Sequence, residues 1–171
     1  MNDFDAIQAS LSNFTKRLDE AVHDRENELR KCSFFDPIPS ECLDSIAIHA
    51  DIITFNKGDK LTVEGEDMDS FFVILFGSVT AYYKEKMVGS IRSGECIGEG
   101  VFFATETLER SATVIADNQV VAAEIKKTGL DHIPPDARAY MDKALLLALF
   151  KKLQGANRKI EDLLRYPAVN S

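Results

Sequence analysis

A series of short strand candidates between residues 60 and 125 restricts the fold more than any other feature of this chain. The candidates are Lys60–Val63, Ser70–Phe76, Ser78–Lys84, Met87–Ile91, Ser111–Ala116 and Gln119–Ile125. Turn residues, chiefly Gly, Asp and Asn, separate them. Short strands at this spacing indicate a sandwich, barrel or jelly roll rather than alternating βα units. Within them, the continuous apolar run Phe71–Leu75 indicates a strand that is buried on both faces.

Helical periodicity precedes this β region. Apolar residues recur at steps of three and four near the N-terminus, at Phe4, Ile7, Leu11, Phe14 and Leu18. Such a seam packs on the protein's own body, the interpretation that we favour, or pairs with another helix. Ser40 is the expected N-cap of a short second helix that extends to Ala47.

Helical periodicity also follows the β region, with Asp136 as a candidate N-cap. One apolar stripe contains Met141, Leu145, Leu149 and Leu153, and a second contains Leu146, Leu147 and Phe150. A helix that is apolar on two sides contacts the β region and something else, either a ligand or another chain. We expect Gly155 to end or kink this helix before a short final one. The expected domains are an N-terminal helix over 1–31, a mainly β domain over 32–135 and C-terminal helices over 136–171.

Composition excludes several classes of partner. The chain has 28 Asp and Glu against 20 Lys and Arg, a formal charge of -8. This balance argues against nucleic acid and anionic membrane surfaces, both of which are bound through clustered cations. The N-terminus is acidic where a signal peptide would be positive, and the longest apolar run, Ala144–Phe150, is too short to span a membrane. Three widely spaced cysteines are expected to be reduced thiols, so we expect a soluble, cytoplasmic protein.

Motifs for catalysis are missing from the sequence. His23, His49 and His132 are isolated from one another, so no metal site is predicted. Gly89 and Gly94 have the glycine spacing of a P-loop, but Glu95 stands where the lysine belongs and would repel a triphosphate. There is no G-x-S-x-G elbow. We therefore predict a protein that is not an enzyme and that carries neither a metal nor a cofactor.

One segment has the composition of a small anion site. Residues 98–101, Gly-Glu-Gly-Val, offer consecutive backbone N–H groups just after a strand, and a helical turn beginning at Val101 would point them outward. Arg110 begins the next strand candidate, close enough to reach back across the loop, and its guanidinium could bind a phosphate through two parallel hydrogen bonds. Glu99 suits a sugar hydroxyl better than a phosphate. An ordinary ion pair between Glu99 and Arg110 is the alternative.

This segment, together with the residues around it, resembles the cyclic-nucleotide-binding domain family. Residues 94–103 and 109–114 resemble its phosphate-binding cassette, F-G-E-[LI]-[AG]-L followed by R-[STA]-A-x-V. Smaller motifs at residues 55–58, 63–66, 70–74, 77–79 and 94–95 follow in the family's order. The resemblance covers about Phe34 to Phe150, and Glu109–Ala112 is most similar to the bacterial catabolite activator subgroup. The resemblance implies that this chain folds as a double-stranded β-helix, or jelly-roll β-roll, and that it is a stand-alone member of the family without a DNA-binding domain.

The resemblance also implies a role for each residue of the segment. Arg110 would hold the cyclic phosphate and Glu99 the ribose 2′-hydroxyl. The backbone amides of Gly100 and Val101 would face the phosphate, and Gly98 would belong to the same nucleotide-binding segment. Ser111 would lie beside the phosphate or the purine, Ile91 and Ile97 would line the wall, and the helix around Leu145–Phe150 would cover the base.

The function that follows is a cyclic-nucleotide sensor without a catalytic domain. We expect cAMP rather than cGMP as the ligand, because of the activator-like cassette. Binding would change the arrangement of the helices, and the helices would join a homodimer or a partner protein. The alternative is a nucleotide-free scaffold with the same fold, in which the helices serve only for assembly.

Overall fold

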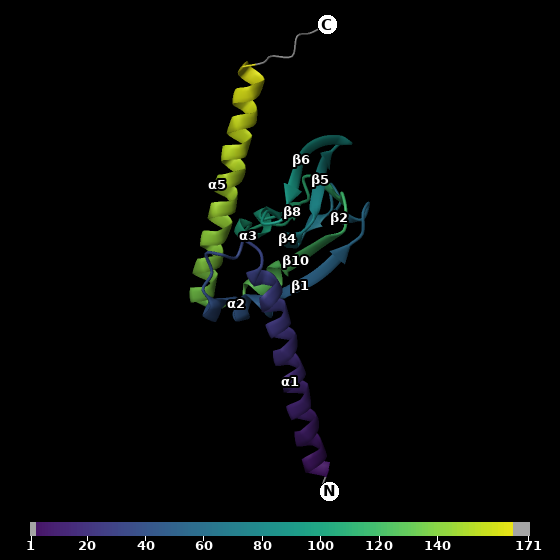
Figure 1. The fold of residues 1–171 in the computed structure, drawn as a ribbon, viewed down its shortest axis with the longest axis vertical. Helices are drawn as coiled ribbons and strands as arrows, with labels where there is room; N and C mark the ends of the chain where they lie inside the picture. Colours follow the sequence, from purple (N-terminus) through teal and green to yellow (C-terminus); the bar gives the residue numbers. More distant parts are fainter. Residues whose placement is uncertain (1–2, 166–171) are drawn as a thin grey trace.

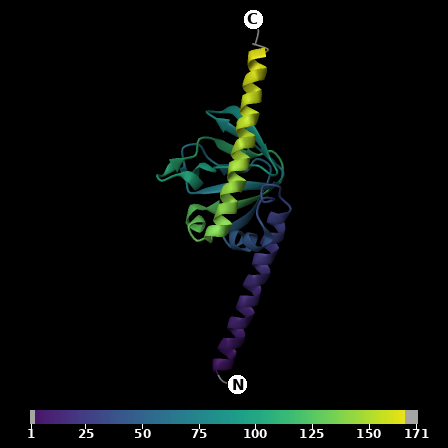
Figure 2. The ribbon, with the colours of Figure 1, turned by 90° about the vertical axis from the view of Figure 1, so that its left-hand side faces the viewer.

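Two long helices extend from a β-roll in opposite directions (Figure 1). The computed structural model describes residues 3–165, with side chains from residue 7 onward. Helix α1 (Asp3–Arg30) leads into the roll, and helix α5 (Pro135–Arg165) leads out of it. In the view turned by 90°, α5 passes across the face of the roll (Figure 2).

The β-roll consists of two four-stranded sheets and a two-stranded ribbon, all paired antiparallel. The first sheet has the order β1 (Ala50–Phe55), β10 (Val120–Lys126), β4 (Ser70–Phe76) and β7 (Cys96–Ile97). The second has the order β2 (Lys60–Thr62), β9 (Thr113–Ala116), β5 (Ser78–Tyr83) and β6 (Lys86–Arg92). The ribbon pairs β3 (Asp67–Met68) with β8 (Leu108–Glu109). The predicted fold class, a mainly β roll with flanking helices, is confirmed.

Strand β4 is buried on both faces, as its continuous apolar run predicted. Phe71 and Val73 pack into the core between the first sheet and the helices. Phe72 and Ile74, on the opposite face, pack into the core inside the roll. The strand is therefore the common wall of two hydrophobic cores.

Three short helices complete the fold: α2 (Ser40–Ala47), α3 (Gly100–Phe103) and α4 (Lys127–Leu130). The predicted N-cap role of Ser40 is wrong. The cap position is Pro39, which makes no side-chain capping bond, while the Ser40 hydroxyl accepts a hydrogen bond from Arg30. Helix α2 packs against the first half of α5, where Met141 and Leu145 are fully buried.

Helix α5 continues through Gly155, contrary to the expected break. A mid-helix glycine costs only about 1 kcal/mol relative to alanine, and no proline follows within the helix to stop it. The helix begins at Pro135 rather than after Asp136. Proline suits a first helical position because its missing N–H would lack an intrahelical partner there in any case.

The apolar seam of α1 does not pack on the protein's own body, so the interpretation that we favoured is wrong. Ile7, Leu11 and Phe14 are more than half exposed and Leu18 is 49% exposed, and the side chain of Phe4 lies outside the described residues. Only the last third of the described helix reaches the body, where Val22 packs against the core, Glu26 is buried and Leu29 is completely buried. The chain turns after Arg30, and this turn directs the rest of α1 away from the roll (Figure 1).

All three cysteines are buried and free. Among residues 3–165, no helix combines the length and hydropathy that crossing a bilayer requires.

Candidate functional site

Arg110 lies between β8 and β9, and only 7% of its surface is exposed. Its Nη2 donates to the Ser70 hydroxyl at 3.0 Å and lies 3.8 Å from a carboxylate oxygen of Asp69. The Ser70 hydroxyl in turn donates to Glu124 at 2.7 Å. The other terminal nitrogen, Nη1, is buried with no hydrogen-bond partner among the described residues. Since an unpaired buried donor is costly, the guanidinium is prepared for an acceptor that the chain itself does not supply.

Burial dominates the electrostatics of this arginine. Loss of solvent lowers the pKa of Arg110 from its ordinary value, and the nearby carboxylates of Asp69, Glu124 and Glu66 oppose that shift in decreasing order. The guanidinium carbon also lies 5.8 Å from the centre of the Phe72 ring. A guanidinium keeps its proton even when buried, so a positive charge is held here with little water around it.

Gly98 makes room for the guanidinium. Its φ of +76° lies in the left-handed region that glycine adopts freely. A Cβ at this position would collide with Nη1 of Arg110 and would lie 3.1 Å from the carbonyl oxygen of Ser70. Glycine at residue 98 is thus required both by the backbone and by the position of the arginine.

Glu99 pairs with a lysine rather than with Arg110, which excludes the ordinary ion pair considered from the sequence. One of its carboxylate oxygens accepts a hydrogen bond from Nζ of Lys152, on α5, at 2.6 Å. The Glu99 side chain is 16% exposed and that of Lys152 is 34% exposed.

A cavity of about 260 Å³ joins these groups. Six of the predicted site residues line it: Ile91, Ile97, Gly98, Glu99, Arg110 and Ser111. Sequence reasoning missed seven others: Thr62, Met68, Ala81, Val88, Ala112, Val114 and Lys152. The alternation of side chains along β5 and β9 could have indicated some of the apolar ones, whereas no local signal marks Lys152.

Gly100 and Val101 do not line the cavity, although both were predicted as site residues. The helical turn expected near them exists as α3, beginning one residue earlier than predicted. The Val101 side chain turns into the core, and its N–H donates to the carbonyl of Gly98 at 3.1 Å. The tight turn therefore satisfies this amide internally.

The part of α5 over the cavity also differs from the prediction. Leu145 is buried against α2, and Phe150 is exposed away from the cavity wall. The α5 residue that lines the cavity is Lys152, two residues beyond the predicted lid segment. Lys152, rather than the predicted segment, reaches the cavity because the first turns of this long helix pack at the base of the roll.

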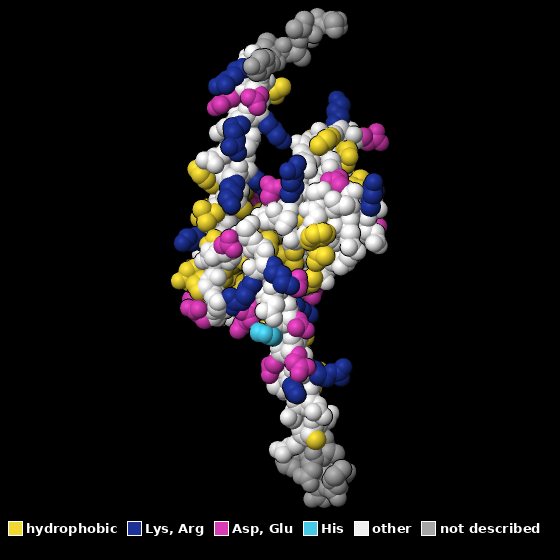
Figure 3. All heavy atoms as spheres, in the orientation of Figure 1, with side chains coloured by type: hydrophobic (Ala, Val, Ile, Leu, Met, Phe, Trp, Pro, Cys, Tyr) yellow, Lys and Arg dark blue, Asp and Glu magenta, His cyan; other side chains and the backbone are white. Residues whose placement is uncertain are grey.

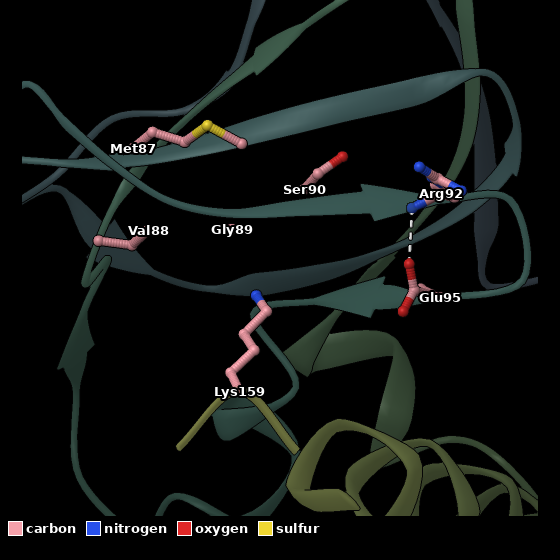
Figure 4. Close-up of a pocket in the computed structure, with 7 residues that line it drawn as sticks. All are labelled: Met87, Val88, Gly89, Ser90, Arg92, Glu95 and Lys159. Atoms are coloured by element: carbon pink, nitrogen blue, oxygen red, sulfur yellow. Dashed lines mark hydrogen bonds between the residues drawn. The ribbon is translucent and has the colours of Figure 1, made fainter. Parts of the chain in front are cut away.

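A second hollow, of about 520 Å³, lies between β6 and α5 (Figure 4). It is larger than the cavity at Arg110, but its lining consists mostly of exposed side chains, Lys159 and Met87 among them. Its single internal hydrogen bond runs from the backbone N–H of Arg92 to Glu95, at 2.7 Å. No buried polar group faces it, so the cavity at Arg110 is the better candidate site. Within residues 3–165, no cluster of His, Cys, Asp or Glu could hold a metal ion.

Comparison with known proteins identifies the region that contains this cavity. Residues 52–133 match the family model described as cyclic nucleotide-binding domain. A cGMP-dependent protein kinase of Toxoplasma gondii is 34% identical over 76 residues, which are 44% of this chain and 7% of the kinase. The chain therefore spans a small part of the curated relatives that it matches.

Two solved structures illustrate the shared fold. A putative cyclic nucleotide-binding protein from Geobacter metallireducens superposes with a TM-score of 0.63 at 20% identity, covering 74% of this chain and 96% of that one. The regulatory domain of Toxoplasma gondii PKA, crystallised with cAMP, gives a TM-score of 0.59 at 18% identity, covering 72% and 49%.

Proposed function

Residues 52–133 are a cyclic nucleotide-binding domain, and from that premise we propose that this protein binds a cyclic nucleotide at Arg110 and acts as a regulator. The observation that carries the proposal is the buried Nη1 of Arg110, which has no partner in the described chain and belongs to a residue that lines the cavity. A cyclic phosphate supplies the missing acceptor and a compensating negative charge. Such charge-assisted bonds are among the stronger ones in proteins.

The other residues of the cavity suit the rest of a nucleotide. The carboxylate of Glu99 can accept a hydrogen bond from a ribose hydroxyl, and the exposed Ser111 stands beside Arg110 at the same cavity. Ile91, Ile97 and Val114 provide apolar wall for a purine. We favour cAMP over cGMP because of the activator-like cassette, although the similar proteins include both a cGMP-dependent kinase and a cAMP-bound regulatory domain.

Calorimetric titration of the full chain with cAMP and cGMP tests the proposal. Arg110→Ala removes two charge-assisted bonds, each contributing about 1.5–3 kcal/mol, and should weaken binding at least about 100-fold. Arg92→Ala is the matched control, because it removes an exposed arginine outside the cavity at Arg110. Absence of heat with the wild-type protein at millimolar nucleotide would instead support the nucleotide-free scaffold.

We also propose that α5 passes the signal on by pairing with a second copy of the chain. Its outer face, on which hydrophobic side chains gather (Figure 3), repeats at steps of four and three through Leu146, Phe150, Leu153, Asn157, Ile160 and Leu164. The apolar members of this series are all more than half exposed. A narrow seam with this period is typical of a coiled coil, and a single asparagine in such a seam commonly fixes its register.

Light scattering tests this pairing. Leu153→Glu places a charge in the seam and should halve the measured mass. Gln154→Glu adds a charge at the neighbouring position, off the seam, and should leave the mass unchanged. A monomeric wild-type protein would contradict the pairing.

A further inference from the structure

Strand β10 carries a carboxylate on the face that is turned toward the interior of the roll. Successive side chains of a strand point to opposite faces. Ala123 and Ile125 belong to the core beneath the helices, whereas Ala122 belongs to the core inside the roll. Glu124 therefore shares the inner face with Ala122, and across the sheet it is paired with Phe72, which is also an inner residue. A half-buried carboxylate on this face needs a polar partner.

The partner of Glu124 is the hydroxyl of Ser70, which is 1% exposed and also contacts Arg110. A guanidinium can only donate hydrogen bonds, and a carboxylate can only accept them. The single hydroxyl proton of Ser70 must therefore point to Glu124, at 2.7 Å, while the Ser70 oxygen accepts from Nη2 of Arg110 at 3.0 Å. Glu124 in this way fixes the rotation of the hydroxyl, and each bond of such a chain polarises the next.

Other contacts fix the backbone of Arg110 or hold its guanidinium only weakly. The Arg110 N–H donates to the carbonyl of Glu66 at 2.7 Å. Asp69 lies 3.8 Å from Nη2, which is too long for a hydrogen bond, and its side chain is 77% exposed, so solvent screens the attraction. The hydrogen-bonded chain through Ser70 to Glu124 is therefore the closest restraint on the guanidinium, and it leaves Nη1 without a partner among the described residues.

We propose that Glu124 is a positioning residue for ligand binding, which acts through the Ser70 hydroxyl to hold Arg110 in the orientation that leaves Nη1 free for the ligand phosphate. This inference rests on the proposed function and adds a residue that does not itself line the cavity. When the acceptor at residue 124 is lost, the hydroxyl proton has no fixed partner and the guanidinium can rotate. Phosphate binding then has to restore the orientation, and this ordering weakens the affinity.

A simple charge effect predicts the opposite result. The Glu124 carboxylate is negative, like the phosphate, so removing its charge alone should strengthen nucleotide binding. The test therefore compares two variants that lose the same charge. In Glu124→Gln the amide oxygen can still accept from Ser70, whereas Glu124→Met has a side chain of similar length with only a weak acceptor. The charge effect is the same in both variants, so the difference between their affinities isolates the hydrogen bond.

Calorimetric titration of the full chain with cAMP and cGMP measures this difference. Glu124→Met should bind the nucleotide about fivefold more weakly than Glu124→Gln, a ratio typical of one hydrogen bond. In a Ser70→Ala background the same two substitutions should give equal affinities, because the hydroxyl through which residue 124 acts is gone. Glu66→Gln is the matched control, since it removes an exposed carboxylate near Arg110 that does not contact Ser70, and it should not weaken binding.

The outcomes separate this inference from the proposed function. Equal affinities of the two Glu124 variants would overturn the positioning role. A fivefold difference that persisted without the Ser70 hydroxyl would overturn the route through Ser70. Thermal melting without nucleotide shows whether each variant is folded at the temperature of the titration, and Glu124→Gln, which keeps the shape of the side chain, should melt as the wild-type protein does. No binding of either nucleotide by the wild-type protein would overturn the proposed function, and the positioning role with it.

Discussion

Replacing Gly98 with alanine should damage both the stability and the ligand binding of this protein through one displaced side chain. The new Cβ would occupy the place of Nη1 of Arg110, so the guanidinium must move. Moving it removes the 3.0 Å hydrogen bond to Ser70 and shifts the cation away from the cavity.

The magnitude follows from two separable costs. A left-handed backbone costs a residue with a Cβ about 1–2 kcal/mol relative to glycine. Loss of a hydrogen bond to the charged Arg110 adds about 1.5–3 kcal/mol. We therefore expect Gly98→Ala to lower the free energy of unfolding by about 3–4 kcal/mol, and to weaken nucleotide binding at least tenfold.

Gly65→Ala separates the two costs, because Gly65 has a φ of +85° but open space around its Cβ position. Urea denaturation should show only the backbone cost for this variant, and calorimetric titration should show unchanged affinity. If Gly98→Ala matched Gly65→Ala in both measurements, the steric argument for the position of Arg110 would be refuted.

Other groups give further expectations. Ser70→Ala leaves the Nη2 of Arg110 without its hydroxyl partner and should cost about 1.5–3 kcal/mol in urea denaturation; an unchanged midpoint would contradict this. The guanidinium of Arg138 lies 3.9 Å from the centre of the Phe102 ring and donates a hydrogen bond to the carbonyl of Leu130. Arg138→Ala removes both contacts and should lower the melting temperature measured by calorimetry. Burial raises the pKa of Cys96 from 9.0 to about 12. The unfolded thiol therefore ionises first, and stability should fall as pH rises from about 9 to about 12. Denaturation of the Cys96→Ala variant, compared with that of the wild-type protein, should lack this part of the loss.

The strands and the arginine site could be predicted because their signals are local. The apolar run of β4 and the turn glycines are visible within a few residues, and the cassette places Glu99 and Arg110 only eleven positions apart. The roll itself then brings Ile91 and Ile97 to the same cavity. Val101 was predicted through its backbone N–H, but in the structure that N–H donates to the carbonyl of Gly98 within the α3 turn, a local bond that the sequence pattern does not reveal.

The positions of the long helices relative to the β-roll could not be predicted. The pairing of Lys152 with Glu99 depends on the direction of α5, which is set by packing at its start, far from the lysine in the sequence. The seam of α1 has the same periodicity whether or not it meets the body. Gly155 shows the limit of a local rule, because a modest propensity cost did not break a long helix.

The two faces of β4 have a consequence for how the protein melts. Since Phe71 and Val73 belong to one core while Phe72 and Ile74 belong to the other, neither compartment can lose its order without removing a wall of its neighbour. The interior of the roll and the layer beneath α2 and α5 are therefore one cooperative unit. A scanning calorimeter should record their melting as a single heat-absorption peak rather than as two.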